Sequence, residues 1–269
     1  MPERAGSAAA AVEIAVVGGG LIGAVAALGI AAQGRRVALV EQAVPATAPG
    51  RFGHDLRNIA AAPATRRLLE DVDVWRSLAP VPYRAMRIWD ARGTGTLVFD
   101  AAELDREALG WMLENGPTQV AVWDALRAHP NVVLRVGEPV AGVRAAADRV
   151  TLELGAARLD AALLIGADGA RSRVRAALGV ATETRETGHA ALATVVRTSA
   201  PHAGVASQCF LEDGPLALLP GPEPDLASVV WSQPLAAAAH RQALPEPAFC
   251  AEITRCMDAC LGTIRASDE

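Results

Sequence analysis

The chain has 269 residues, of which 51% are hydrophobic and 20% are charged, so it can bury a sizeable core in one large domain or two intimate ones. The formal net charge of −5 gives no electrostatic reason to expect a nucleic-acid partner. Residues 1–11 lack the basic start and long apolar core of a signal peptide, so we interpret them as a loose tail.

The most informative stretch begins with four apolar, mostly β-branched residues at 14–17, which predict a strand buried on both faces. Gly18, Gly20 and Gly23 follow at G-x-G-x-x-G spacing, and an apolar run to 32 predicts a helix. Gly18 is expected to form the turn, Gly20 to let a pyrophosphate approach the backbone, and Gly23 to let the helix lie close to the strand. With free N–H groups at the helix start, the pattern predicts a dinucleotide site.

A second strand, at 36–41, ends in Glu41, whose carboxylate is expected to accept hydrogen bonds from ribose hydroxyls. The same charge would repel a 2′-phosphate, so the site favours FAD or NAD over NADP. A membrane-spanning helix is the alternative for 14–32, because this stretch carries no charge. Its five glycines argue against a membrane helix, since each costs about 1 kcal/mol relative to alanine in a helix interior.

The middle of the chain alternates between helical and strand patterns. The expected elements are a loop at 42–62, a helix from Pro63 with an apolar face to Leu78, strands at 86–90 and 96–99, a helical region at 105–128 broken near 116–117, a strand at 131–136 and a hairpin within 139–154.

A second buried strand, at 161–165, runs into Gly166-Ala-Asp-Gly-Ala170 and a helix from about Arg171. Asp168 in this turn has a structural explanation as a helix N-cap, which can coexist with a role near a cofactor. From 189 onward an antiparallel sheet is expected, followed by helices near 234–243 and 246–261.

The four cysteines form no C-x-x-C pair, and no histidine lies near them at ligand spacing. We interpret them as small buried hydrophobes with free thiols, typical of a reducing cytosol, and predict no metal site.

These motifs resemble the flavin-dependent aromatic hydroxylases related to para-hydroxybenzoate hydroxylase, and most of all their ubiquinone-biosynthesis branch. The first glycine motif is shared by many flavoproteins, whereas Asp168-Gly169 is more specific to these hydroxylases. The other matching segments are Asp55-Leu-Arg57, Leu68-Leu-Glu70, Val74-Trp75, Ile88-Trp-Asp90, Glu114-Asn115 with Gln119, the whole of Gly166-Ala-Asp-Gly-Ala-Arg-Ser-Arg173, Pro201-His202, Gln208 with Phe210, Gly214-Pro-Leu-Ala-Leu-Leu-Pro220 and Val230-Trp-Ser232.

The resemblance implies an α/β fold in which a Rossmann-like FAD-binding domain is interleaved with a smaller α+β substrate domain built on an antiparallel sheet. We assign 1–80 and 105–185 to the FAD-binding domain, and 81–104 and 186–269 to the substrate-binding domain. The implied cofactor-binding residues are Gly18, Gly20 and Gly23 at the FAD pyrophosphate, Glu41 at the adenosine ribose, Arg57 and Gln119 at FAD, and Asp168 and Gly169 near the pyrophosphate, where they would also help the nicotinamide cofactor dock.

The resemblance also implies the reaction. Flavin reduced by NAD(P)H would react with O2 to a flavin hydroperoxide, which hydroxylates an aromatic ring of a ubiquinone precursor, while the protein orients the substrate and excludes water. No acid–base residue is required by the sequence, so the catalytic residues stay unassigned. His202 could be mistaken for a base, but we expect it to pack or cap a strand. Arg57 without the family match could be a solvated surface charge.

One family segment is not found: a Gly-Asp pair with a proline- and glycine-rich stretch, which binds the flavin ribityl chain. The similarity runs to about Leu261-Gly262 and the sequence ends at 269. We therefore expect the C-terminal part of the FAD domain, including a strand and a large helix, to be absent, which exposes apolar surface. Either a fragment of a longer enzyme or a degenerate homologue would explain this.

Three alternatives remain open. The enzyme could hydroxylate another aromatic compound, or the chain could be a non-catalytic scaffold associated with other quinone-biosynthesis proteins. An NAD-linked dehydrogenase would explain 18–41 but not 166–173. We expect a cytoplasmic location, peripheral to the inner membrane, because a precursor with a long isoprenoid tail would need membrane access.

Overall fold

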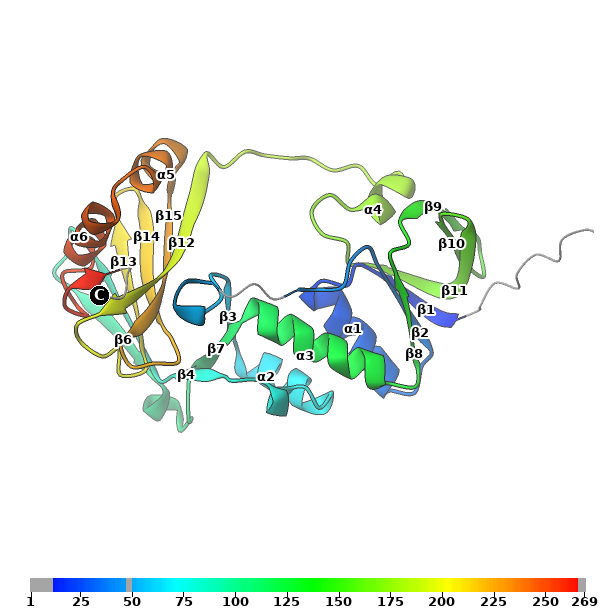
Figure 1. The fold of residues 1–269 in the computed structure, drawn as a ribbon, viewed down its shortest axis with the longest axis horizontal. Coiled ribbons are helices and arrows are strands. Elements are labelled where there is room, and N and C mark those ends of the chain that lie inside the picture. Colours follow the sequence, from blue (N-terminus) through cyan, green and yellow to red (C-terminus); the bar gives the residue numbers. More distant parts are fainter. Residues whose placement is uncertain (1–11, 47–49, 266–269) are drawn as a thin grey trace, which may run out of the picture. The chain divides into compact units, whose positions relative to one another are not determined.

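The computed structural model describes residues 12–46 and 50–265, so the tail expected at 1–11 lies outside the described residues (Figure 1). The chain divides into two compact units. Unit 1 takes its described residues from 12–46, 67–78 and 116–184, and unit 2 takes them from 50–66, 79–115 and 185–265. Four described stretches that the sequence division placed with the FAD-binding domain lie in unit 2, namely 50–66, 79–80, 105–115 and 185.

Unit 1 is built on a six-stranded sheet in the order β8-β2-β1-β11-β10-β9. Four strands are parallel: β1 (Val12–Val17), β2 (Val37–Glu41), β8 (Val132–Val136) and the C-terminal half of β11 (Ala157–Gly166). The hairpin of β9 (Val140–Ala145) and β10 (Val150–Leu154) extends the sheet in antiparallel fashion from the N-terminal half of β11. The carboxyl ends of β1, β2 and β11 therefore lie at one edge, where α/β sheets bind ligands.

Unit 1 also contains the helices α1 (Leu21–Ala32), α3 (Asn115–Ala128) from Gly116 onward, and α4 (Arg173–Ala177), together with the C-terminal part of α2 (Pro63–Asp71). α1 has only 12 residues, and no helix of the described chain is long and apolar enough to cross a membrane. The alternative of a membrane span at 14–32 is therefore wrong, because that stretch is a strand, a turn and a helix.

Apolar surface of unit 1 lies uncovered on α1 and β11. α1 carries no polar side chain, yet Ile22 is 78% exposed. β10 pairs with β11 only as far as Ala161, and beyond it Leu163 is 52% exposed on a strand that has β1 as its sole partner among the described strands. A helix that is apolar all round and a parallel strand are normally buried on every side. Apolar surface of the kind that folded proteins normally bury is therefore exposed at these two places in unit 1.

Unit 2 contains a seven-stranded sheet in the order β16-β12-β15-β14-β13-β5-β6. Its strands are β5 (Ala85–Asp90), β6 (Thr96–Asp100), β12 (His189–Thr198), β13 (Val205–Leu211), β14 (Gly214–Pro220), β15 (Leu226–Pro234) and β16 (Ile264–Arg265). All neighbours are antiparallel except β13 and β5, which run parallel.

One face of this sheet packs against α6 (Glu246–Cys256) and forms the core of unit 2, and α5 (Leu235–Gln242) also contacts the sheet at β12 and β15 (Figure 1). Trp231 and Leu216 from the strands and Ile253 from α6 are almost completely buried in it. The helices predicted near 234–243 and 246–261 are thus present, although α6 ends five residues early.

A second, three-stranded sheet in unit 2 corrects two predictions. It consists of β3 (Asn58–Ala61), β7 (Gly110–Glu114) and β4 (Val81–Tyr83). The loop expected at 42–62 therefore contains a strand and a short 3-10 turn at Arg51–Gly53. The region expected to be helical at 105–128 contains the strand β7, and its helix begins only at Asn115. Trp, Met, Leu and Glu in β7 have adequate helix propensity, but pairing with two strands distant in sequence decides its conformation.

The helix predicted from Pro63 to Leu78 ends early. α2 spans Pro63–Asp71, and a short 3-10 turn covers Trp75–Ser77. Asp73 has a φ of 56° and so lies in the left-handed region, which a helix cannot contain. Aspartate tolerates this conformation better than most residues, because its short polar side chain can hydrogen-bond locally. The apolar residues as far as Leu78 therefore lie on both sides of a turn at Asp73 and not along one continuous helix.

Candidate functional site

The first glycine turn joins β1 to α1 and leaves no room for larger side chains at two of its three motif positions. Gly18 has a φ of +103°, and a Cβ there would overlap the carbonyl oxygen of Ala167. A Cβ on Gly23 would overlap the carbonyl oxygen of Gly18, so this glycine lets α1 pack against the turn. These are the conformational roles expected of the two residues from their spacing.

Gly20 differs from its neighbours because nothing in the protein occupies the space in front of it. A Cβ built on Gly20 would meet no atom within 4 Å. Its φ of −61° and ψ of 173° are open to any residue, so the backbone itself does not demand glycine. Gly20 is the N-cap of α1, with no side-chain hydrogen bond at that end of the helix. The N–H groups of the first turn therefore face space that the protein leaves free.

A cavity of about 620 Å³ lies at this edge of unit 1. It brings together the ends of three parallel strands and the turns that follow them. The lining residues are Val17, Gly18, Gly20, Val40, Glu41, Gln42, Glu138, Val140, Ala167, Asp168, Gly169, Arg171 and Arg173. Five of the eight sequence-predicted site residues therefore share one cavity, although they come from three separate segments.

Glu41 lies at the end of β2 and points to the glycine turn. Its Oε2 accepts a hydrogen bond from the Gly19 N–H at 2.5 Å, and its Oε1 accepts one from the Gln42 N–H at 2.6 Å. Oε1 also accepts from the Ala43 N–H at 3.4 Å. Because a carboxylate oxygen has about two acceptor positions, Oε2 can still accept a hydroxyl. The carboxylate is thus fixed in place by the backbone and lines the cavity.

Asp168 follows β11, and its carboxylate holds the start of α4. Its Oδ2 accepts hydrogen bonds from the N–H groups of Arg173 at 2.6 Å and Val174 at 3.2 Å. Burial acts to raise the pKa of Asp168, but hydrogen bonds from the Ser172 side chain and from these two N–H groups outweigh it and lower the pKa. The capping role expected for Asp168 is present, and Ser172 is the formal N-cap.

The other oxygen of Asp168 is free for a further donor. Oδ1 is buried and has no hydrogen-bond partner among the described residues. A buried acceptor without a donor costs free energy, so a ligand hydroxyl or N–H group at the cavity would relieve that cost. Open space at Gly20, free helix N–H groups and this unpaired oxygen together fit a dinucleotide.

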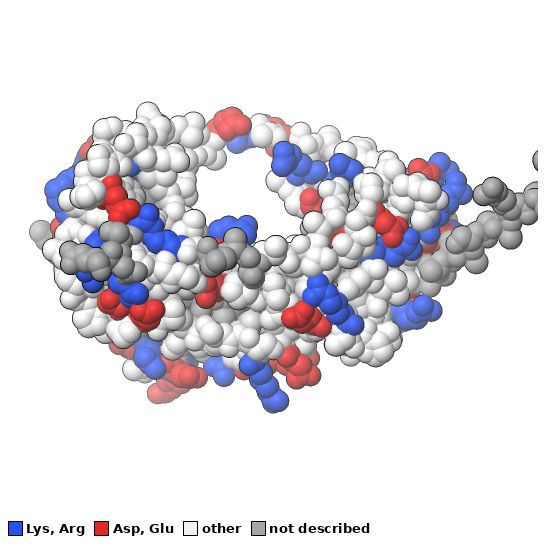
Figure 2. All heavy atoms as spheres, viewed as in Figure 1, with Lys and Arg blue, Asp and Glu red and all other residues white. Residues whose placement is uncertain are grey.

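Two arginines at the cavity were not identified from the sequence. Arg171 and Arg173 lie on either side of Ser172, are exposed and line the cavity. Their charge suits a phosphate and balances the acids across the cavity. Both lie in the segment from Gly166 to Arg173 that resembles the family, and this is the sequence signal that could have indicated them. Over the face seen in Figure 2, by contrast, basic and acidic side chains are interspersed.

Gln119 supports the glycine turn from α3 and is not among the lining residues of the cavity. Its Nε2 donates to the Gly19 carbonyl oxygen at 3.2 Å, and one helical turn later the Trp123 Nε1–H donates to the same oxygen at 2.8 Å. Trp123 is completely buried. The sequence did not single out Trp123, although its i+4 spacing from Gln119 places both on one helix face.

Arg57 belongs to unit 2, unlike the other seven predicted site residues. Its side chain is exposed, and its N–H donates to Asp55 Oδ1 at 2.9 Å. Nearby, Glu114 Oε2 accepts from the Asp55 N–H at 2.7 Å and lies 3.3 Å from Nδ1 of the buried His54. The Asp55-Leu-Arg57 segment is therefore held by backbone hydrogen bonds that leave the Arg57 guanidinium at the surface.

His202 is held structurally, as we expected. It is 9% exposed, its Nδ1 accepts from the Gly204 N–H at 3.0 Å, and its Nε2 lies 2.9 Å from the Glu223 carbonyl oxygen. These partners assign the proton to Nε2 and a neutral ring. With both nitrogens engaged by the backbone, His202 is not available as a base.

The cysteines behave as buried apolar groups. Cys209 and Cys250 are almost fully buried, and burial raises the pKa of the Cys209 thiol to about 11. Burial also raises the pKa of Cys250, Cys256 and Cys260. All four are free thiols that stay protonated at neutral pH.

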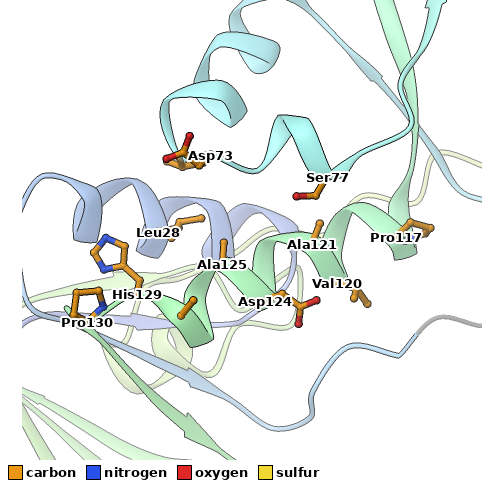
Figure 3. Close-up of a pocket in the computed structure, with 12 residues that line it drawn as sticks. Leu28, Asp73, Ser77, Pro117, Val120, Ala121, Asp124, Ala125, His129 and Pro130 are labelled. Atoms are coloured by element: carbon orange, nitrogen blue, oxygen red, sulfur yellow. The ribbon is translucent and has the colours of Figure 1, made fainter.

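A second cavity in unit 1, of about 710 Å³, contains none of the predicted site residues (Figure 3). Leu28 of α1, the turn around Asp73 and Ser77, and α3 residues such as Ala121 surround it. Although it is larger than the cavity at the glycine turn, it lacks a free helix N-terminus and glycine-lined backbone. The site chemistry therefore points to the smaller cavity.

Comparisons with known proteins agree with this geometry. A family model described as an FAD binding domain matches residues 11–262. The 3-demethoxyubiquinol 3-hydroxylase of Escherichia coli is 36% identical over 256 residues, which cover 94% of this chain and 65% of that protein. The ubiquinone hydroxylase UbiL of Rhodospirillum rubrum is 31% identical, with 97% of this chain and 61% of that protein covered.

The chain thus spans less than two thirds of the length of these two relatives. Among solved structures, p-nitrophenol 4-monooxygenase PnpA from Pseudomonas putida has the same fold, with a TM-score of 0.70 at 22% identity over 92% of this chain and 63% of that one. Because the family model covers most of the sequence, the chain belongs to the FAD binding domain family, and its relatives include ubiquinone-biosynthesis hydroxylases.

Proposed function

We propose that this chain forms the greater part of an FAD-dependent monooxygenase that hydroxylates an aromatic ring of a ubiquinone precursor, with NAD(P)H as reductant. The observation that carries the proposal is the free space in front of Gly20, next to the uncapped N-terminus of α1. When bound, FAD would supply the redox and oxygen-transfer chemistry. The protein supplies binding, orientation and exclusion of water.

In this proposal each cavity residue has one task. The α1 N-terminus and the backbone at Gly18 and Gly20 would bind the pyrophosphate, with Gly23 allowing the close packing behind them. Glu41 would accept hydrogen bonds from the adenosine ribose. Gln119 would act indirectly, because its hydrogen bond fixes the Gly19 carbonyl.

The second turn and unit 2 contribute the remaining proposed contacts. Asp168 would accept a hydrogen bond at its unpaired Oδ1, and Gly169, whose φ is +77°, would present bare backbone to the pyrophosphate and to the nicotinamide cofactor. Arg57, with its exposed guanidinium, would contact FAD from unit 2. We propose the FAD-binding and substrate-binding roles for units 1 and 2 respectively.

The substrate would bind the face of the seven-stranded sheet opposite the α6 core. The register aligns Gln208, Ala217 and Val230 across three strands, and Phe210 follows on the same face. Val230 is 37% and Phe210 45% exposed, although Cys209, Val229 and Trp231 beside them in the strands are buried. An apolar surface beside a single amide suits an aromatic ring that carries oxygen substituents.

A location peripheral to the membrane follows from the same proposal. A ubiquinone precursor with an isoprenoid tail stays in lipid, so the enzyme would collect it from the cytoplasmic side, alone or with other quinone-biosynthesis proteins.

A non-catalytic partner protein is a second candidate, favoured by the uncovered apolar surface at Ile22 and Leu163. Purification with FAD followed by absorbance in the flavin bands separates the two. Retained flavin, together with NAD(P)H oxidation that depends on an added ubiquinone precursor and gives a hydroxylated product, supports the enzyme. A colourless protein that never retains flavin supports the partner protein and refutes our proposal for this chain.

A further inference from the structure

The cavity at the glycine turn contains a third acid besides Glu41 and Asp168. Glu138 lies two residues after the end of β8 and is among the residues that line the cavity. The Gly137 N–H donates to the Glu41 carbonyl oxygen at 2.9 Å, so the turn that carries Glu138 is joined to the end of β2. A carboxylate with no task in FAD binding so far therefore faces the same cavity.

The Glu138 carboxylate is held in one orientation by Arg135 of β8. Arg135 Nε donates to Glu138 Oε1 at 2.7 Å, and Arg135 Nη2 donates to Oε2 at 2.5 Å. These hydrogen bonds lower the pKa of Glu138 below its ordinary value, so the group is ionised at neutral pH and can only accept hydrogen bonds. Arg135 is its only donor among the described residues, and the side chain is 31% exposed, so each oxygen can accept one more.

The order of the strand ends gives the order of groups along the cavity. Gly18 follows β1, Glu41 ends β2 and Glu138 follows β8, and these three strands are adjacent in the sheet (Figure 1). Neighbouring strands lie about 4.8 Å apart, so the turn after β8 is about 10 Å from the glycine turn. With the pyrophosphate at Gly18 and the ribose at Glu41, the base of the nucleotide lies toward Glu138. Val40 and Val140, which also line the cavity, offer apolar contacts to the faces of a base.

We propose that Glu138 selects the base of the bound nucleotide by accepting a hydrogen bond from the exocyclic amino group of adenine. Hypoxanthine and guanine carry a carbonyl oxygen at the same ring position, so two acceptors would face each other there. An acceptor left without a donor costs free energy, and the site therefore rejects 6-oxo purines. The amide of Gln42, which also lines the cavity, can donate or accept and does not discriminate in this way. The inference rests on the proposed FAD function and adds a specificity-determining residue to it.

Competition against bound FAD, followed by flavin fluorescence, tests the selection. The competitors are ADP and inosine diphosphate, which carry an amino and an oxo group at C6 of the base. We expect ADP to displace FAD from the wild-type chain at a concentration at least about tenfold lower than inosine diphosphate does. In Glu138→Gln the amide can either donate or accept, so this ratio should fall to about threefold or less.

Glu153→Gln is the matched control. Glu153 also lies in unit 1, its Oε1 is 2.6 Å from Nη2 of Arg144, and its side chain is 29% exposed, close to the value for Glu138. It is not among the lining residues of the cavity. The control therefore removes the same charge from the same kind of ion pair, and it should keep the wild-type preference for ADP.

The outcomes separate this inference from the proposed function. FAD that binds but is displaced equally by the two diphosphates, or is not displaced by ADP, overturns the role of Glu138 and leaves the proposed function intact. A full preference for ADP in Glu138→Gln does the same. A wild-type chain that binds no FAD overturns both. Because the wild-type ratio needs no substitution, it tests base selection even if a variant fails to fold.

Discussion

The two glycine turns of unit 1 look alike in sequence but are completed differently. After β1, the N-terminus of α1 has no side-chain cap, and the space before Gly20 is empty of protein. After β11, the carboxylate of Asp168 and the hydroxyl of Ser172 occupy the N-terminus of α4. The first turn leaves its donors for a ligand, whereas the second uses an acid to satisfy them. Substitutions at the two turns should therefore separate binding from stability.

The largest effect is expected from Gly18→Ala. The φ of +103° and the overlap of a Cβ with the Ala167 carbonyl oxygen together should cost at least about 3 kcal/mol of unfolding free energy. Urea denaturation followed by circular dichroism measures it. Gly34→Ala is a control with a comparable positive φ of +85° but open space, and it should cost less. Equal losses would mean that the packing against Ala167 does not matter.

The next largest effect is expected where α3 supports the first turn. Trp123→Phe removes the 2.8 Å hydrogen bond to the Gly19 carbonyl and should cost about 1–2 kcal/mol. Gln119→Leu removes the longer bond to the same oxygen and should cost less. The double variant leaves this carbonyl unpaired, so its loss should exceed the sum of the two single losses. Simple additivity in denaturant unfolding would show that the carbonyl has another donor.

A smaller effect is expected at the second turn. Asp168→Ala removes the acceptor for two N–H groups at α4 and should cost about 1 kcal/mol at pH 7. Because the folded pKa of Asp168 is lowered, the stabilisation is fully present above the unfolded pKa of about 3.9 and is lost as the pH falls through the folded pKa.

The stability difference between wild type and Asp168→Ala should therefore shrink in unfolding curves recorded below about pH 4. Asp148→Ala is the control, because the pKa of Asp148 is lowered by Arg149 at the surface, where an ion pair contributes little. A gap that stays constant from pH 7 to pH 3 would rule out a stabilising carboxylate at Asp168.

Local signals predicted the first turn well. The alternation of strand, glycines and helix over 14–41 depends on neighbours in sequence, and the strand, turn and helix appear there, with Glu41 at the end of β2. The same holds for the β5–β6 and β9–β10 hairpins. The three-stranded sheet was missed because β3 and β7 are 48 residues or more apart and neither has a strong strand pattern.

The site residues also divide into those that a local sequence pattern predicts and those that only the folded structure reveals. Gly18, Gly20, Glu41, Asp168 and Gly169 follow strand ends in a parallel sheet, so topology brings them to one cavity. Arg171 and Arg173 follow the Asp168 turn in sequence, but only the cavity shows that they line the site. The supporting role of Trp123 becomes apparent only from its hydrogen bond to Gly19.

FAD titration of the wild-type chain and Gly20→Val, followed by flavin fluorescence, tests the central claim most directly. Nothing in the protein lies within 4 Å of a Cβ at Gly20, so the variant should keep its unfolding free energy, as should Gly29→Val, where the space around α1 is also open. We predict FAD binding by wild type and Gly29→Val, and a loss of affinity of at least about a hundredfold in folded Gly20→Val, because the side chain takes the place of the pyrophosphate. Undiminished affinity in Gly20→Val would contradict the account.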